Sequence, residues 1–179
     1  KVYQPTRGTI LLDGLDTAGK TTAQINRMGI ARTFQNIRLF NNLSVEDNVK
    51  IGLHNQTRYS ALAGVLRLPS YWKQERAAHD RAMELLSIFD MEQMASFKAG
   101  SLPYGAQRRL EIVRALATNP SLLLLDEPAA GMNPSETAEL MENIVKIRDT
   151  FQIAIMLIEH DMNLVMSICE GICVLNFGQ

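Results

Sequence analysis

The sequence predicts an α/β fold, in which helices cover a parallel sheet and a helical segment is inserted into it. From residue 121 onward, strand-like and helix-like patterns alternate, an order that is typical of a parallel sheet. Residues 36–117, in contrast, carry almost only helical patterns. We therefore expect three parts: residues 1–35 supply a β-rich remnant and one strand, residues 36–117 form a helical subdomain, and residues 118–179 complete the core.

The first half of the chain is expected to contain two strands and two helices. Apolar residues bounded by glycine or polar residues indicate strands at 9–12 and 29–35. A helix is expected over residues 43–53, with Ser44 as its N-cap. Residues 74–91 form an amphipathic helix in this prediction, because apolar side chains recur there at helical spacing.

The second half supplies most of the predicted core. Residues 105–118 are expected to form a helix. The continuous apolar runs at 122–125 and 153–158 are typical of strands buried on both faces. A short helix and a last strand over residues 172–176 are expected to follow.

Two local signals mark helix boundaries in this half. Asn119 and Pro120 end the helix that precedes the apolar run, since the residue before proline is biased away from helical geometry. Asn133 is a favourable N-cap, with Pro134 at the first helical position and Glu136 at the third. These signals predict a turn followed by a new helix after the first buried strand.

Composition excludes several classes of protein. The 179 residues include 18 basic and 19 acidic ones, for a formal net charge of -1, so we expect no nucleic-acid partner. The apolar runs are too short to span a bilayer. Cys169 and Cys173 have no further metal-ligating residues near them in sequence, and we expect two reduced, buried thiols.

Polar side chains follow three of the predicted strands, at the point where each strand ends. These are Gln35, the pair Asp126 and Glu127, and His160. Because the carboxyl ends of parallel strands meet at one edge of a sheet, we expect these side chains to lie close together. One carboxylate can hold Mg²⁺, and a second can orient or deprotonate a water molecule. The pattern therefore predicts nucleotide hydrolysis at this edge.

Five short motifs resemble those of the nucleotide-binding subunits of ABC transporters. TFQ at 33–35 resembles the Q-loop, and LPYGAQ at 102–107 occupies the position of the signature motif. LLLLDEP at 122–128 resembles the Walker B strand with its catalytic glutamate. AAGMNP at 129–134 is similar to the D-loop, and IEHD at 158–161 to the switch-histidine loop. The longer strings RTFQNIRLF, PYGAQRRLEI, DEPAAGMNP and IMLIEHDM resemble the ATP-binding subunits of branched-chain amino-acid importers most closely.

The resemblance implies a P-loop NTPase-like core and an ATPase that uses ATP and Mg²⁺ to drive uptake of branched-chain or related amino acids. It assigns Glu127, His160 and Gln35 to catalysis, and Asp126 and Gln35 to the metal. The residues that it assigns to nucleotide binding are Leu102, Pro103, Tyr104, Gly105, Ala106, Gln107 and Asn133. In the usual motifs Pro103 would be serine, Tyr104 glycine and Asn133 aspartate, so a hydroxyl and a charge are lost.

The implied partners are those of a transporter. They are a second ATP-binding subunit, transmembrane permease subunits and, indirectly, a periplasmic or extracellular solute-binding protein. The implied location is the cytoplasmic face of the membrane. Residues 59–72 are apolar and loop-like, and we hypothesise that they form a docking surface for a membrane subunit.

Residues 14–21 (GLDTAGKT) match the phosphate-binding pattern G-x-x-x-x-G-K-[ST] letter for letter. Lys20 nevertheless lies only fifteen residues before Gln35, which leaves no room for the helix and strands between a Walker A loop and a Q-loop. Residues 2–13 already resemble the strand that comes after the true Walker A helix. We therefore expect a decoy, a chain that is incomplete at its N-terminus and inactive by itself, and a missing strand beside the Walker B strand.

Three alternatives remain open. A GTPase-like switch that uses residues 14–21 predicts an N-K-x-D motif, which the sequence lacks. A soluble, non-transport ABC ATPase usually has a glycine-rich signature and long insertions. The third alternative is a binding module without catalysis. The remaining polar residues receive ordinary explanations: His54 and His79 as solvated surface residues, and Arg108 and Arg109 as the polar face of a helix.

Overall fold

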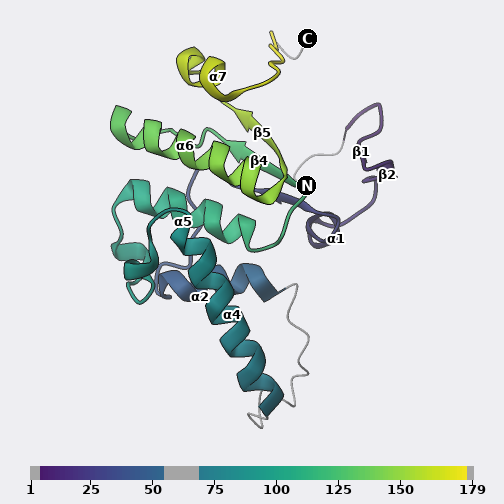
Figure 1. Cartoon of the computed structure of the whole chain (residues 1–179). Helices are drawn as coiled ribbons and strands as arrows, with labels where there is room; N and C mark the ends of the chain where they lie inside the picture. The colour runs from purple at the N-terminus through teal and green to yellow at the C-terminus, as the bar shows by residue number, and fades with distance from the viewer. Residues whose placement is uncertain (1–4, 55–68, 177–179) are drawn as a thin grey trace.

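The computed structural model describes residues 5–54 and 69–176, and its centre is a three-stranded parallel sheet (Figure 1). The strands β3 (Ile30–Arg32), β4 (Leu122–Asp126) and β5 (Ala154–Ile158) lie in the order β3-β4-β5. Leu123 pairs with Ala31 on one side and with Ile155 on the other. The predicted α/β class, with a parallel sheet and an inserted run of helices, is confirmed.

Among the described residues, five helical elements lie between β3 and β4. They are α2 (Val45–Leu53), α4 (Pro69–Ser87), η2 (Glu92–Met94), η3 (Ala99–Ser101) and α5 (Tyr104–Leu116). Figure 1 shows α2 and α4 below the sheet, with α4 projecting away from it. Their apolar faces are buried together, and the fully buried side chains there include Val45, Val49, Leu85, Leu86 and Leu110.

Capping side chains set the starts of the two helices that the sequence marked. Ser44 Oγ accepts the Asp47 N–H at 3.0 Å at the start of α2. Asn133 Oδ1 accepts the Glu136 N–H at 2.9 Å at the start of α6 (Pro134–Phe151), and Glu136 Oε2 accepts the Asn133 N–H in return. Both N-caps agree with the predictions, because a cap depends on residues within one turn.

Several expectations for the other elements are wrong. Helix α4 starts at Pro69, so residues 69–72 of the predicted apolar loop are helical, and residues 59–68 lie outside the described residues. Residues 172–176 form no strand and are exposed. Strand β5 is not buried on both faces, since Met156 is 62% and Ile158 60% exposed.

Two further corrections concern β4 and the cysteines. Strand β4 is paired on both sides, so a missing strand cannot lie beside it; in the described sheet the outer strands are β3 and β5. Cys169 is half-buried and Cys173 is exposed, although both are free thiols. Within residues 5–54 and 69–176, the helices are all too short or too polar to cross a membrane.

Residues 11–16 form a small antiparallel hairpin instead of a phosphate-binding loop. Strands β1 (Leu11–Leu12) and β2 (Leu15–Asp16) pair across Asp13 and Gly14, whose φ angles are 47° and 78°. Positive φ at both central residues is the geometry of a two-residue hairpin turn. A six-residue helix, α1 (Thr22–Arg27), connects this hairpin to β3.

Candidate functional site at the carboxyl edge of the sheet

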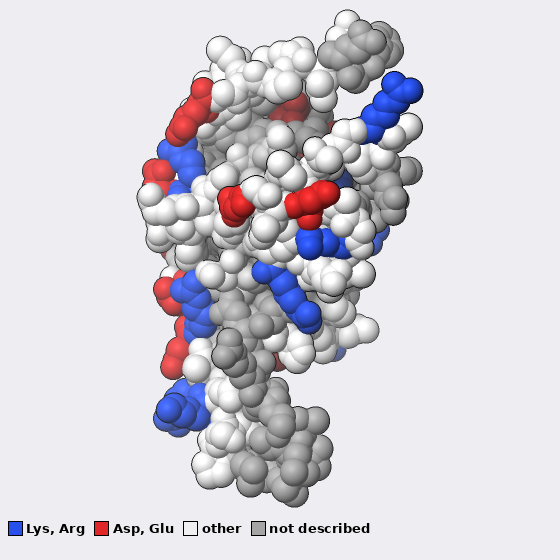
Figure 2. Space-filling model, turned by 90° about the vertical axis from the view of Figure 1, so that its right-hand side faces the viewer, with Lys and Arg blue, Asp and Glu red and all other residues white. Residues whose placement is uncertain are grey.

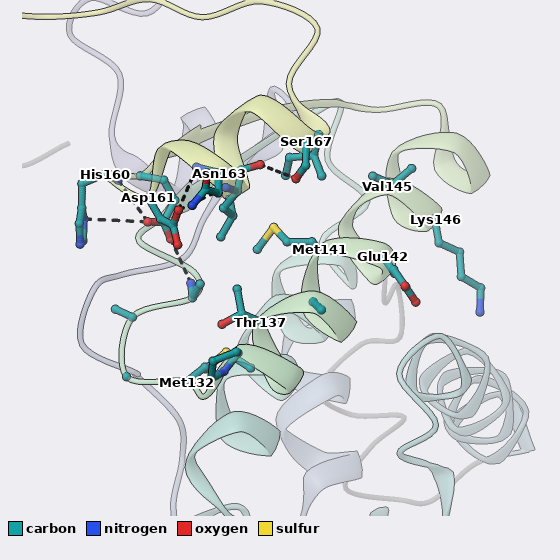
Figure 3. A pocket seen from close by; sticks show the side chains of 18 of the residues that line it. Met132, Thr137, Met141, Glu142, Val145, Lys146, His160, Asp161, Asn163 and Ser167 are labelled. Carbon is teal, nitrogen blue, oxygen red and sulfur yellow. Dashed lines mark hydrogen bonds and ion pairs between the residues drawn. The ribbon is translucent and has the colours of Figure 1, made fainter.

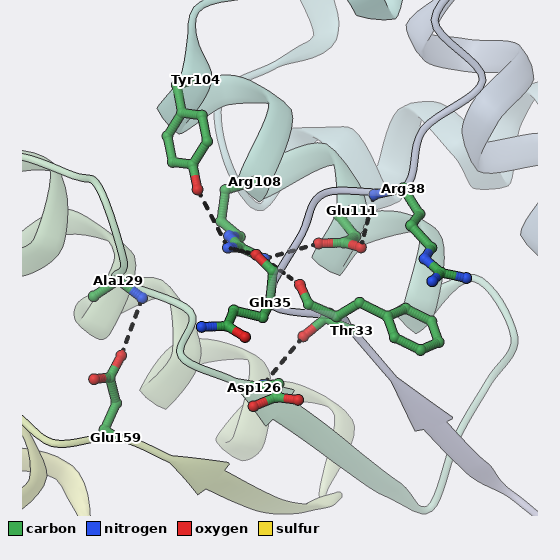
Figure 4. Close-up of polar contacts among 10 residues, drawn as sticks. Thr33, Gln35, Arg38, Tyr104, Arg108, Glu111, Asp126, Ala129 and Glu159 are labelled. Atoms are coloured by element: carbon green, nitrogen blue, oxygen red, sulfur yellow. Dashed lines mark hydrogen bonds and ion pairs between the residues drawn. The ribbon is translucent and has the colours of Figure 1, made fainter. Parts of the chain in front are cut away.

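The ends of β3 and β4 bring three of the predicted site residues, Gln35, Asp126 and Glu127, to one edge of the sheet. Figure 4 shows two of them, Gln35 and Asp126. Gln35 Nε2 donates to Glu127 Oε2 at 3.0 Å, although the two residues are 92 positions apart. Asp126 ends β4, and its Oδ2 atom lies 2.7 Å from Arg32 Nη2. The structure therefore places Gln35, Asp126 and Glu127 at one edge, as the strand order predicted.

Backbone geometry turns Glu127 away from the axis of its strand. Its N–H donates to Ile158 O at 2.9 Å, and its φ angle is 45°, in the left-handed region. Thr33 N–H donates to Leu124 O at 3.0 Å, and Thr33 Oγ1 accepts the Asp126 N–H at 3.4 Å. These bonds hold the segments on both sides of the carboxylate pair.

His160 is not brought into this cluster. Its side chain is 80% exposed, and its Nδ1 atom lies 3.9 Å from Glu159 Oε2. Asp161 next to it caps α7 (Met162–Ile168), because Oδ1 accepts the N–H groups of Asn163 and Leu164. Asp161 therefore has a structural role, and the imidazole of His160 is largely exposed to solvent beside the groove that both residues line (Figure 3).

Glu159 is a site residue that sequence reasoning missed. Its side chain is only 3% exposed, and its Oε1 atom accepts the Ala129 N–H at 3.2 Å. The other carboxylate oxygen accepts the His160 N–H at 3.3 Å. Glu159 therefore connects the D-loop-like segment (129–134) to the switch-like segment (158–161) by hydrogen bonds. In the sequence, its place between Ile158 and His160 was the one feature that could have indicated this role.

Arg108 is the second residue that was missed. Its guanidinium is fully buried and donates to Phe34 O at 2.6 Å and to Gln35 O at 2.7 Å. It also contacts Glu111 Oε2 at 3.1 Å and, more loosely, Tyr104 Oη at 3.4 Å. The sequence placed Arg108 on the polar face of a helix, but the side chain is buried, because it binds backbone carbonyls of a distant segment. Arg109 agrees better with a position on the polar face of the helix, since its side chain is partly exposed and pairs with Glu139.

The signature-like segment, residues 102–107, starts α5 and packs on the start of α6. Leu102, Gly105 and Ala106 are buried, whereas Pro103 and Tyr104 are exposed. A Cβ atom on Gly105 would lie 2.9 Å from Glu136 Oε1, so glycine permits this close approach. Gln107 Nε2 donates to Leu102 O at 2.8 Å and closes the turn. The N-terminus of α5 remains a place where an anion would be favoured.

Donor chemistry at the β4 edge fits a magnesium ion. Mg²⁺ is held by one or two carboxylates with water molecules and phosphate oxygens completing its octahedral shell. Asp126 supplies such a carboxylate, and Gln35 retains its amide oxygen because it uses its amide nitrogen for Glu127. No cluster of three or more histidine, cysteine, aspartate or glutamate side chains suited to a metal occurs in the part of the chain that the structure describes. The fit is that of a metal bound together with a phosphate ligand.

Residues 14–21 do not have the form of a phosphate cradle in this structure. Leu15 and Asp16 belong to a hairpin strand, and Lys20 N–H donates to Thr17 O at 3.3 Å. Thr21 caps α1, since its Oγ1 accepts the Gln24 N–H at 3.3 Å. A P-loop runs directly from a parallel strand into a long helix, and neither neighbour is of that kind here.

A groove of about 980 Å³ runs between α6, α7 and residues 129–132 (Figure 3). Thr137, Met141 and Glu142 line it from α6, and Asn163 and Ser167 from α7. It lies next to the carboxyl edge because His160 and Asp161 line it as well. On the face shown in Figure 2, acidic and basic side chains are interspersed, as expected for a nearly neutral chain.

Comparison with known proteins gives a consistent result. Residues 1–130 match the family model described as ABC transporter. The chain is 44% identical over 176 residues to the high-affinity branched-chain amino acid transport ATP-binding protein BraF of Pseudomonas aeruginosa, and 46% identical to LivG of Escherichia coli K12. These alignments cover 98% of this chain and 69% of each relative.

Solved structures show the same likeness. CbiO1 from Clostridium perfringens, part of the ABC transporter complex cbiONQ, superposes with a TM-score of 0.76 at 26% identity, over 94% of this chain and 62% of that one. A nucleotide-free ATP-binding cassette from an ABC transporter gives a TM-score of 0.73 at 26% identity, over 93% and 64%. The chain thus spans a little under two thirds of the solved proteins.

Proposed function

Because this chain belongs to the ABC transporter family, we propose that it is part of an ATP-hydrolysing subunit that drives uptake of branched-chain or related amino acids. The predicted resemblance to ABC ATP-binding subunits, and among them to those of branched-chain amino-acid importers, is confirmed. The observation that carries the hydrolytic part is the contact between Gln35 and Glu127 beside Asp126. The cargo rests on what BraF and LivG are named for.

The proposed chemistry assigns one task to each group at the edge. Asp126 would hold Mg²⁺ and Gln35 would complete its shell, and the ion would neutralise charge on the phosphate oxygens. Glu127 would orient the attacking water and accept its proton. The hydrogen bond from Gln35 fixes one carboxylate oxygen of Glu127 and leaves the other for this water.

Two side chains must change their contacts for this assignment to work. Arg32 occupies Asp126 Oδ2 and is 48% exposed, so a metal would displace it at little cost in buried contacts. His160 points to solvent, and we propose that it turns toward the terminal phosphate when ATP is bound, where its ring N–H would stabilise the developing charge.

A second ATP-binding subunit would supply the opposite face of the site. We propose that residues Leu102 to Gln107 and Asn133 face the nucleotide of that second subunit, with the N-terminus of α5 toward the phosphates. Transmembrane permease subunits would contact the helices between β3 and β4, at the cytoplasmic face of the membrane. A solute-binding protein would act only through the permease.

The decisive experiment replaces the proposed base in the full-length subunit. Glu127→Gln keeps an oxygen that can accept from Gln35 but removes the negative charge, so we expect hydrolysis to fall at least about 100-fold while ATP binding persists. Glu84→Gln is the matched control, because Glu84 is 63% exposed and pairs with Arg81 on its own helix. Unchanged hydrolysis in Glu127→Gln would contradict the proposal.

Two more measurements address the cargo and the decoy loop. Uptake of radiolabelled leucine by vesicles that contain the subunit and its permease should disappear with Glu127→Gln. Lys20→Ala should leave ATP affinity unchanged, because residues 14–21 form a hairpin strand and a helix cap. For the same reason we expect the 179-residue chain by itself not to hydrolyse ATP. Micromolar ATP affinity that Lys20→Ala abolishes would refute the decoy interpretation.

A further inference from the structure

Arg108 connects the turn after β3 to helix α5 through buried, charge-assisted hydrogen bonds. Its two terminal nitrogens donate to consecutive carbonyls, those of Phe34 and Gln35, at 2.6 and 2.7 Å. The guanidinium side chain has no exposed surface. Hydrogen bonds from a charged donor are shorter and stronger than those between neutral groups, and the forked shape of arginine fixes both acceptors at once.

Glu111 completes this connection one turn further along α5. Its Oε2 atom lies 3.1 Å from Arg108 Nη1, and its Oε1 atom accepts the Arg38 N–H at 3.2 Å. The carboxylate is 2% exposed and neutralises the buried guanidinium. The pair therefore holds both sides of the turn, at residues 34–35 and at residue 38.

This connection reaches the proposed catalytic groups directly. Gln35, whose carbonyl Arg108 holds, is the residue whose amide contacts Glu127 at 3.0 Å. Packing alone would be satisfied by apolar residues of similar volume, which often stabilise a core as well as a buried ion pair does. A charged pair that binds backbone groups on both sides of this turn instead fixes where the turn lies.

We propose that Arg108, supported by Glu111, is a positioning residue that fastens the Gln35 backbone to α5. The inference rests on the function proposed above, since its consequence is catalytic. The signature-like segment begins α5, so any displacement of that segment would move Gln35 and change its contact with Glu127. Arg108 thereby couples the two parts of the site without touching the nucleotide itself.

The test compares Arg108→Met with Arg109→Met in the full-length subunit. Arg109 is the next residue on the same helix and also forms an ion pair, but its partner is Glu139 on α6 and it does not hold residues 34–38. Arg108→Met leaves the buried carboxylate of Glu111 without the cation that neutralises it, so a second variant combines Arg108→Met with Glu111→Leu. Thermal unfolding of every variant identifies the temperature at which all are folded.

Two readouts separate positioning from general stability. Hydrogen exchange of the backbone amides at residues 34–38, without nucleotide, should speed up in both Arg108 variants and not in Arg109→Met. Under folded conditions, kcat for ATP should fall about tenfold or more in the Arg108 variants with little change in KM, because a misplaced Gln35 affects the reacting geometry more than binding. Arg108→Lys, which has no fork, should lie between wild type and Arg108→Met.

Unchanged exchange at residues 34–38 would overturn the proposal, and so would an equal loss of kcat in Arg109→Met. A wild-type subunit without ATPase activity would instead overturn the proposed function, and the catalytic consequence with it. The exchange measurement would then still decide whether Arg108 fastens the turn.

Discussion

Replacing Gly52 by alanine tests how closely α2 and α5 are packed. A Cβ atom at this position would lie 2.5 Å from Arg114 O and 2.7 Å from Ala117 Cβ, both on or next to α5. Ordinary contacts begin at 3.4 Å, so the helices would have to separate by about 0.9 Å. Neither obstacle can rotate away, because one is a backbone carbonyl and the other is a Cβ atom.

The expected free-energy change follows from two opposing terms. Overpacking a core costs about 1–3 kcal/mol, and the overlap with two rigid atoms at Gly52 places this cost in the upper part of the range, at about 2–3 kcal/mol. Alanine in place of glycine inside a helix stabilises the helix by about 1 kcal/mol. We therefore expect Gly52→Ala to lower the free energy of unfolding by about 1–2 kcal/mol, which corresponds to a fall in Tm of about 2–8 °C for a chain of this length.

Thermal and urea unfolding followed by circular dichroism would measure this change. Ile51→Ala is the control on the same helix, because Ile51 is 40% exposed and its truncation removes little buried contact. An unchanged or higher Tm for Gly52→Ala would refute the packing argument. A shift of α5 should also loosen the Arg108 contacts, so exchange at residues 34–38 provides a second check.

Three other predictions concern stability. Leu123→Ala, at a fully buried position in the central strand, should cost about 2–5 kcal/mol in urea unfolding, and a loss below 1 kcal/mol would show that the sheet is less well packed than described. Asn133→Ala should cost about 1 kcal/mol, because it removes the side chain that caps α6, while Asn133→Ser should retain most of it. Burial raises the pKa of Glu46, but hydrogen bonds from Lys50 and His79 outweigh this effect and leave the pKa below its usual 4.5. The ionised carboxylate therefore stabilises the fold fully above pH 4.5, and this stabilisation is lost as pH falls through the lowered pKa. Glu46→Gln should make the free energy of unfolding fall less steeply below pH 4.5 than in the wild type, and an equally steep fall would refute this prediction.

Features that depend on a few neighbouring residues were predictable from the sequence. The apolar run of β4 and the cap of α6 are of this kind, because strand propensity, proline geometry and capping act within one turn. The convergence of Gln35 with Glu127 was also predictable, since parallel strands place their carboxyl ends at one edge.

Features that depend on distant partners were not predictable. Arg108 is buried by carbonyls 73 and 74 positions away, and no local pattern encodes them. Residues 172–176 have the composition of a strand, but a strand also needs a neighbour with which to pair, and these residues are exposed. The expectation that both faces of β5 are buried failed for the same reason, because an apolar sequence does not determine which element covers each face of a strand.

The left-handed backbone of Glu127 has a consequence for how this position can vary. Such a conformation costs a residue other than glycine about 1–3 kcal/mol, so glycine is the residue that the backbone itself would favour at φ 45°. Glu127→Gly would therefore raise the melting temperature while it removes the carboxylate. Thermostability and turnover oppose each other at this single position, and a screen that selects only for stability would select against the site.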